Sequence, residues 1–139
     1  MATEAEVTNA ADLLEEARGL LSRSSPETAG LWPRAAALLG RQALEAALDD
    51  LWRAKKLTLA TCSTSAQLLC LREYLGDPDL AGRAAQAWGA LSRACHHHPY
   101  ELAPVAGELE RWLATTAQVV RTVVPGHDDR NRPLTESID

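Results

Sequence analysis

Three consecutive histidines, His96, His97 and His98, follow Arg93 after two intervening residues and precede Tyr100 by one. An imidazole titrates near neutral pH and can take up or release a proton, whereas a guanidinium stays cationic and can stabilise negative charge. Adjacent side chains at a helix end point in different directions, so we expect at least one of the three imidazoles to be exposed. The segment is therefore the chain's best candidate for acid–base chemistry.

The same segment also contains groups that bind metals. Imidazole and thiolate groups are ordinary zinc ligands, and Cys95 directly precedes the histidines. Consecutive residues rarely converge on one ion, however, and the sequence has no second cluster of ligands. The fourth histidine, His127, lies in a polar C-terminal stretch. We therefore expect no metal site and no cofactor.

Apolar residues recur at intervals of three and four along most of the chain, which is the pattern of amphipathic helices. Small polar residues, glycine and proline separate these segments, as at Ser63, Gly76 and Pro78. The predicted helices span about residues 4–23, 33–54, 65–75, 78–95 and 101–124. They indicate one all-α domain over residues 1–124, an antiparallel four- to five-helix bundle, followed by a polar tail at 125–139 that we expect to be disordered.

The candidate segment lies at the junction of the last two predicted helices. One side of the helix at 78–95 is apolar, and the opposite side carries Gly82, Gln86, Gly89 and Arg93. Small residues on an outer face allow another helix to approach closely. We therefore predict that Arg93 faces a second subunit rather than its own core, and that the protein is a homodimer through this face.

Other residues have simpler interpretations. On the helix predicted at 33–54, Arg41 with Glu45 and Asp49 with Arg53 have the (i, i+4) spacing of ion pairs on a solvated face. The cysteines outside the candidate segment are expected to be small buried hydrophobes. These are Cys62 and Cys70.

The composition excludes several classes of protein. A net charge of −5 and a pI near 5.3 argue against coating nucleic acid by bulk electrostatics. The first twenty residues lack the basic start and apolar run of a secretory signal, and no stretch approaches the roughly 20 apolar residues of a membrane span. The sparse cysteines, without CxxC spacing, are typical of reduced thiols. We expect a cytoplasmic protein that does not enter a membrane.

The spacing Arg93-x4-His98-x-Tyr100 resembles the motif of the HEPN superfamily, in the form found in HEPN toxins that are paired with minimal nucleotidyltransferases. The predicted architecture is also similar, because the HEPN fold is an antiparallel helical bundle whose motif lies across a helix end and the following loop. The resemblance covers residues 1 to about 124. It implies a metal-independent endoribonuclease, the toxin of a toxin–antitoxin or defence system.

The resemblance also implies roles for individual residues. His98 would transfer protons and Arg93 would stabilise charge on the phosphate, in a composite site built by two protomers. Tyr100 would be the position that a nucleotidyltransferase antitoxin adenylylates. From the residues alone, Tyr100 is equally consistent with a ring that packs on the core. His96 and His97 are candidates for binding or regulation beside the catalytic pair.

One position departs from the family pattern. HEPN proteins often carry Asn or another polar residue directly after the arginine, and here that residue is Ala94. The missing side chain puts catalytic competence in doubt but not the fold. The alternative function is therefore a catalytically inactive interaction or regulatory module with the same helical fold.

Overall fold

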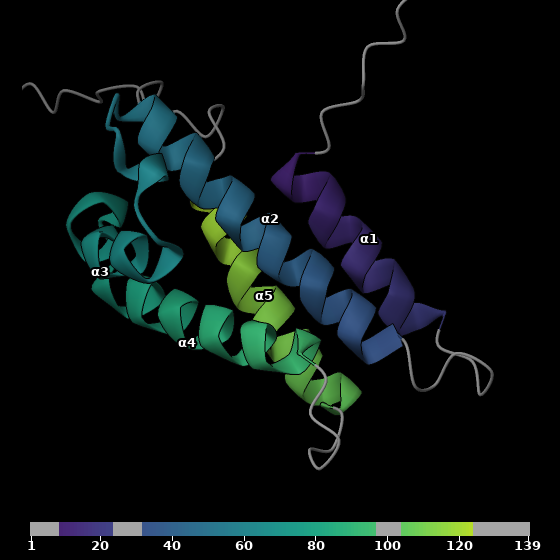
Figure 1. The fold of residues 1–139 in the computed structure, drawn as a ribbon. Helices are drawn as coiled ribbons and strands as arrows, with labels where there is room; N and C mark the ends of the chain where they lie inside the picture. The colour runs from purple at the N-terminus through teal and green to yellow at the C-terminus, as the bar shows by residue number, and fades with distance from the viewer. Residues whose placement is uncertain (1–8, 24–31, 97–103, 124–139) are drawn as a thin grey trace, which may run out of the picture.

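A computed structural model of the protein describes residues 9–23, 32–96 and 104–123 (Figure 1). These residues form five α-helices, one short 3-10 helix and no strand. The elements are α1 (Ala10–Ser22), α2 (Trp32–Ala54), η2 (Leu59–Thr61), α3 (Thr64–Leu75), α4 (Pro78–Cys95) and α5 (Ala106–Val123). The expected all-α bundle is confirmed, whereas the predicted tail lies outside the described residues.

Residues that satisfy free backbone N–H groups start three of the helices. Asn9, Ser63 and Asp77 each accept a hydrogen bond from the backbone N–H three residues later, at the beginnings of α1, α3 and α4. Gly76 ends α3 with a φ of 75°, a left-handed conformation that glycine adopts without steric cost. Pro78 then begins α4, where its missing N–H breaks no helical hydrogen bond.

The start of α5 differs from the prediction. The described residues Pro104 and Val105 are not helical, and α5 begins at Ala106 rather than near residue 101. The carbonyl of Val105 accepts hydrogen bonds from the N–H groups of Glu108 and Leu109, which places the first helical turn after the proline. A helix that began near residue 101 would need the backbone N–H of residue 104 for its first turn, and proline has none.

Helix α2 is the centre of the bundle. Figure 1 shows α2 crossing the molecule between α1 on one side and α4 and α5 on the other, and it packs against all three. α2 runs antiparallel to α1 and α4, and α5 runs back alongside α4 in the opposite direction. None of the helices in the described parts of the chain is both long and apolar enough to span a membrane.

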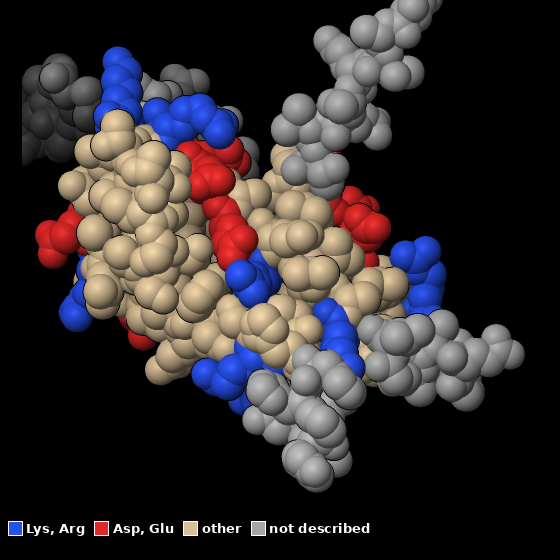
Figure 2. All heavy atoms as spheres, in the orientation of Figure 1, with Lys and Arg blue, Asp and Glu red and all other residues tan. Residues whose placement is uncertain are grey.

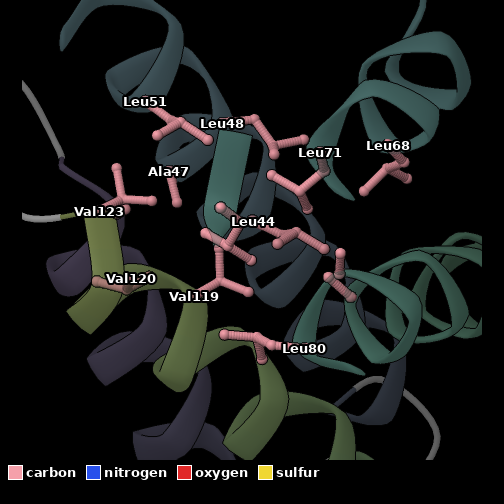
Figure 3. Packing of buried hydrophobic residues seen from close by; sticks show 14 of the residues in the cluster. Leu44, Ala47, Leu48, Leu51, Leu68, Leu71, Leu80, Val119, Val120 and Val123 are labelled. Carbon is pink, nitrogen blue, oxygen red and sulfur yellow. The ribbon is translucent and has the colours of Figure 1, made fainter. Parts of the chain in front are cut away.

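The core is made of leucine, valine and alanine side chains from every α-helix. Figure 3 shows Leu44 and Leu48 of α2, Leu71 of α3 and Val119 of α5 pointing toward one another. All four are fully buried. Burying a side chain of this size contributes roughly 1.5–3 kcal/mol, so this contact holds α3 and α5 on α2.

One polar pair lies inside this apolar core. The indole Nε1 of the fully buried Trp52 donates to Gln67 Oε1 at 2.8 Å, and Gln67 Nε2 donates to the backbone carbonyl of Cys62 at 2.9 Å. The Trp52 N–H, the Gln67 amide oxygen and the Gln67 amide nitrogen each have a partner, so their burial carries little penalty. These two hydrogen bonds attach α3, and the residue Cys62 just before it, to α2. Cys62 itself is exposed, so the expectation of a buried thiol there was wrong.

The buried pair gives a first prediction. Gln67→Leu leaves the buried Trp52 N–H without an acceptor and removes the donor to the Cys62 carbonyl, and it should lower the free energy of unfolding by about 2 kcal/mol. Urea denaturation measures this loss. The matched control is Gln42→Leu on the exposed side of α2, which should change stability by less than about 0.5 kcal/mol. Equal effects of the two substitutions would contradict this account of Gln67.

Candidate functional site

The structure places the first part of the candidate segment at the C-terminal end of α4. Arg93 lies in the last turn and is exposed, and His96 is the exposed residue that ends the helix. The backbone N–H of His96 donates to the carbonyl of Arg93 at 3.3 Å, while its own backbone is extended, with φ −86° and ψ 136°. The chain therefore leaves the helix at His96, the first histidine of the candidate segment.

The predicted residues His97, His98 and Tyr100 lie outside the described residues. The arrangement of Arg93 relative to His98 therefore stays a prediction from the sequence. Within the described parts of the chain, no group of three His, Cys, Asp or Glu side chains is placed to hold a metal ion.

Arg93 lies on the outward face of α4, as the helical pattern predicts. Gly82, Gln86 and Arg93 are exposed, and Gly89 is partly exposed. A Cβ atom added at Gly82 would meet nothing within 4 Å, and one added at Gly89 would meet only the Arg93 guanidinium, at 3.5 Å. The side chain of Arg93 thus lies back over Gly89, along an open face of the helix.

No described residue forms a side-chain hydrogen bond or an ion pair with Arg93. The ion pairs of the described residues lie elsewhere, at Arg41–Glu45, Arg53–Asp50 and Arg83–Asp79. An exposed guanidinium without a carboxylate partner keeps all its N–H donors available. It can accept a phosphate group without first breaking an internal pair.

The inner side of the same helix end carries a polar cluster that the sequence analysis missed. Glu45 Oε1 accepts hydrogen bonds from Arg41 Nε at 2.9 Å and from the indole Nε1 of Trp88 at 3.1 Å. The Arg41 guanidinium also lies over the Trp88 ring, 5.6 Å from its centre. The expected Arg41–Glu45 ion pair is present, but both side chains are partly buried against α4, so the expectation of a solvated face was wrong.

This cluster reaches the candidate segment through Cys95. The Arg41 guanidinium lies 3.8 Å from Cys95 Sγ, and the thiol donates to the backbone carbonyl of Ser92 at 3.3 Å. The hydrogen bond to Glu45 raises the pKa of Arg41 above its ordinary value, and the guanidinium is cationic with or without this shift. The last turn of α4 is therefore held on its inner side, two residues from Arg93. In the sequence, Arg41 and Glu45 are only a common (i, i+4) pair. The contact of Trp88 with both residues is what ties this pair to α4.

Further along α2, the predicted pair Asp49–Arg53 is replaced by another. Arg53 pairs with Asp50 at 3.2 Å, which lies three residues away on the same helix face. Asp49 is exposed as a residue, but neighbouring atoms partly desolvate its carboxyl group, and this raises its pKa. Arg53 opposes that shift, while Asp50 and Glu45 add to it.

The shifted carboxyl gives a prediction for stability against pH. A pKa that is higher in the folded state than in the unfolded state stabilises the protein at low pH, and this contribution is lost as the pH rises through the folded value. At pH 7 the charged Asp49 is therefore unfavourable. Asp49→Asn should be more stable than wild type at pH 7, and the gain should shrink toward pH 3.

Urea midpoints measured between pH 3 and pH 7 check this prediction. The control is Asp50→Asn, which removes the carboxylate that Arg53 contacts and should give no gain at pH 7. A gain for Asp49→Asn that is the same at every pH, or no gain at pH 7, would show that the carboxyl group is not desolvated.

No protein-family model matches the chain, and no curated protein or solved structure is significantly similar to it. The motif, the helical architecture and the exposure of Arg93 are therefore the grounds on which a function is proposed.

Proposed function

We propose that the chain is a HEPN-like, metal-independent endoribonuclease whose site is completed in a homodimer. The observation that carries the proposal is Arg93, an exposed guanidinium without an ion-pair partner among the described residues. It stands at the helix end from which the rest of the motif, His98 and Tyr100, continues. The all-helical bundle of the described residues is compatible with this family.

The reaction requires no group beyond side chains and the RNA. The ribose 2′-hydroxyl attacks the adjacent phosphorus, the bond to the 5′-oxygen breaks, and the products are a 2′,3′-cyclic phosphate and a 5′-hydroxyl. His98 carries the proton from the 2′-hydroxyl toward the leaving oxygen. Arg93 stabilises the negative charge that builds on the phosphate oxygens in the transition state.

A second protomer supplies the other half of the site. One chain offers one motif arginine and one motif histidine, and an arginine exposed beside an open helix face is accessible to a twofold-related copy. Gly82 and Gly89 on that face leave room for a helix of the partner to approach. His96 and His97 would lie beside the catalytic pair as binding or regulatory residues.

The biological setting follows from the same resemblance. We propose a cytoplasmic toxin of a toxin–antitoxin or defence system, with a nucleotidyltransferase as the antitoxin partner. Tyr100, two residues after the motif histidine, is the proposed site of adenylylation. Modification at that position would add bulk and charge next to His98, which explains how it would silence the enzyme.

A second candidate is a catalytically inactive interaction module of the same fold. One observation favours it. Ala94 replaces the polar residue that often follows the family's arginine.

RNA cleavage separates the two functions. With EDTA present, wild type should cleave single-stranded RNA, and His98→Ala should lower the rate by about 100-fold or more because general acid–base catalysis is lost. Arg93→Ala should have a similar effect, since one charge-stabilising group is typically worth about 100-fold. The control is Arg121→Ala, an exposed arginine followed by His127 without a tyrosine two residues later. Equal rates for all four proteins would favour the inactive module.

The dimer has its own test. Gly82→Gln should leave the monomer fold intact, because a Cβ at this position meets nothing within 4 Å, but it should block close approach of a second helix. Light scattering should give twice the 15.0 kDa chain mass for wild type and a shift toward the single-chain mass for the variant. Gly107→Gln, equally unobstructed but on α5, is the control. A single-chain mass for wild type at micromolar concentration would exclude the composite site.

A further inference from the structure

At one end of the bundle, four helices meet in a small apolar cluster, which we call the end cluster. Three of its residues are fully buried, and five partly buried side chains pack against them. Its members are Leu21 of α1, Trp32 and Ala37 of α2, Leu91, Ala94 and Cys95 of α4, and Leu109 and Trp112 of α5. The cluster therefore brings the ends of α1 and α4 and the beginnings of α2 and α5 together at the candidate segment.

Four arginines lie close in sequence to this cluster. Each of the four helices carries one of them, in the helix or at its C-cap, within two residues of a cluster member, and we call this set the arginine rim. The rim consists of Arg23, Arg34, Arg93 and Arg111. Arg34 is partly exposed and the other three are exposed. A helix-based scaffold thus presents four guanidinium groups around the end where the motif begins.

The rim is not neutralised by the described residues around it. No rim arginine forms an ion pair with a described acid, and Arg23 contacts only the backbone carbonyl of Gly19 in its own helix, at 3.1 Å. Within two residues of the end cluster, the described acids are Glu108 and Glu110. Elsewhere in the described chain, Arg41, Arg53 and Arg83 each pair with a carboxylate on the same helix, whereas Arg18, Arg72 and Arg121 form no ion pair with a described residue.

The surface view agrees with this distribution. Figure 2 shows blue side chains at the lower right, beside the ends of α4, α2 and α1, whereas the run of red side chains along α2 stops before this region. Among the described residues near the end cluster, four arginines outnumber two glutamates, although the net charge of the whole chain is −5. Bulk charge excludes non-specific coating of nucleic acid, but it does not exclude a local phosphate-binding surface.

We infer that the arginine rim binds the phosphate backbone of single-stranded RNA on either side of the cleaved bond. The inference rests on the proposed function, because Arg93 belongs both to the motif and to the rim, and this makes RNA the occupant. Planar guanidinium groups bind phosphate oxygens with two parallel hydrogen bonds and need no base contact. The rim would thus hold the strand without reading its sequence.

The test uses a fluorescein-labelled 20-nucleotide RNA in which every 2′-hydroxyl is methylated, so the proposed reaction cannot occur on it. Anisotropy gives the affinity of the full chain over a range of NaCl concentrations. Arg23→Gln and Arg111→Gln are the rim variants. The matched control is Arg121→Gln, because Arg121 is exposed on the same helix as Arg111 and has no ion pair with a described residue, yet it lies about 15 Å further along.

Each rim variant should flatten the slope of log affinity against log salt by about 0.7, which corresponds to about fivefold weaker binding at 0.1 M salt. Arg121→Gln should match wild type. The inference is overturned if wild type does not bind the RNA, which is the result expected if the rim binds an acidic protein instead. It is also overturned if Arg121→Gln weakens RNA binding as much as the rim variants do.

Cleavage of unmodified RNA keeps the two proposals apart. If cleavage depends on Arg93 and His98 but Arg111→Gln and Arg121→Gln have the same salt dependence, the rim fails and the ribonuclease stands. If the rim variants alone lose salt-dependent binding and no variant or wild type cleaves RNA, the ribonuclease fails while the rim stands as a binding surface.

Discussion

The close approach of α2 to α4 and α5 at Gly40 is the contact on which the candidate site depends. A Cβ atom at this position would lie 2.6 Å from Leu113 Cδ2 and 3.5 Å from Leu91 Cδ2, so the absence of a side chain lets the three helices meet. Leu91 and Leu113 are both almost completely buried by this contact. Since Leu91 lies half a turn before Arg93 on α4, the packing that buries one side of the helix also turns the other side outward.

The end of α4 thus has two faces with different physical roles. On the inner face, Glu45 binds Arg41 and Trp88, and Arg41 reaches Cys95, so polar contacts and apolar packing fix the helix end to α2. On the outer face, Arg93 has no ion-pair partner in the described chain. A functional group benefits from this division, because the scaffold holds its backbone while its donors stay available for a ligand. The same logic applies to the arginine rim, where buried end-cluster residues position exposed guanidinium groups.

Much of the fold is predictable from local sequence signals. Ser63, Gly76 and Asp77-Pro78 mark helix ends by chemistry that acts over three or four residues, and the structure ends and begins α3 and α4 there. The outward position of Arg93 follows from helical periodicity alone. Contacts between helices do not follow in this way. The pairing of Glu45 with Trp88 depends on how α4 is placed against α2, and a sequence pattern read one helix at a time treats Arg41 and Glu45 as a solvated pair. Arg53 has carboxylates three and four residues before it, at Asp50 and Asp49, and spacing alone does not decide which of them it pairs with.

In the composite site that we propose, Arg93 of one protomer and His98 of its partner act on the same phosphate. The most direct measurement is subunit complementation: differently tagged Arg93→Ala and His98→Ala chains are co-expressed, and the doubly tagged dimer is purified and assayed on RNA. The mixed dimer keeps one intact arginine and one intact histidine, so we predict that it cleaves RNA well above either variant alone. A mixed dimer as inactive as both single variants, beside an active wild-type dimer, would contradict a site shared between two copies.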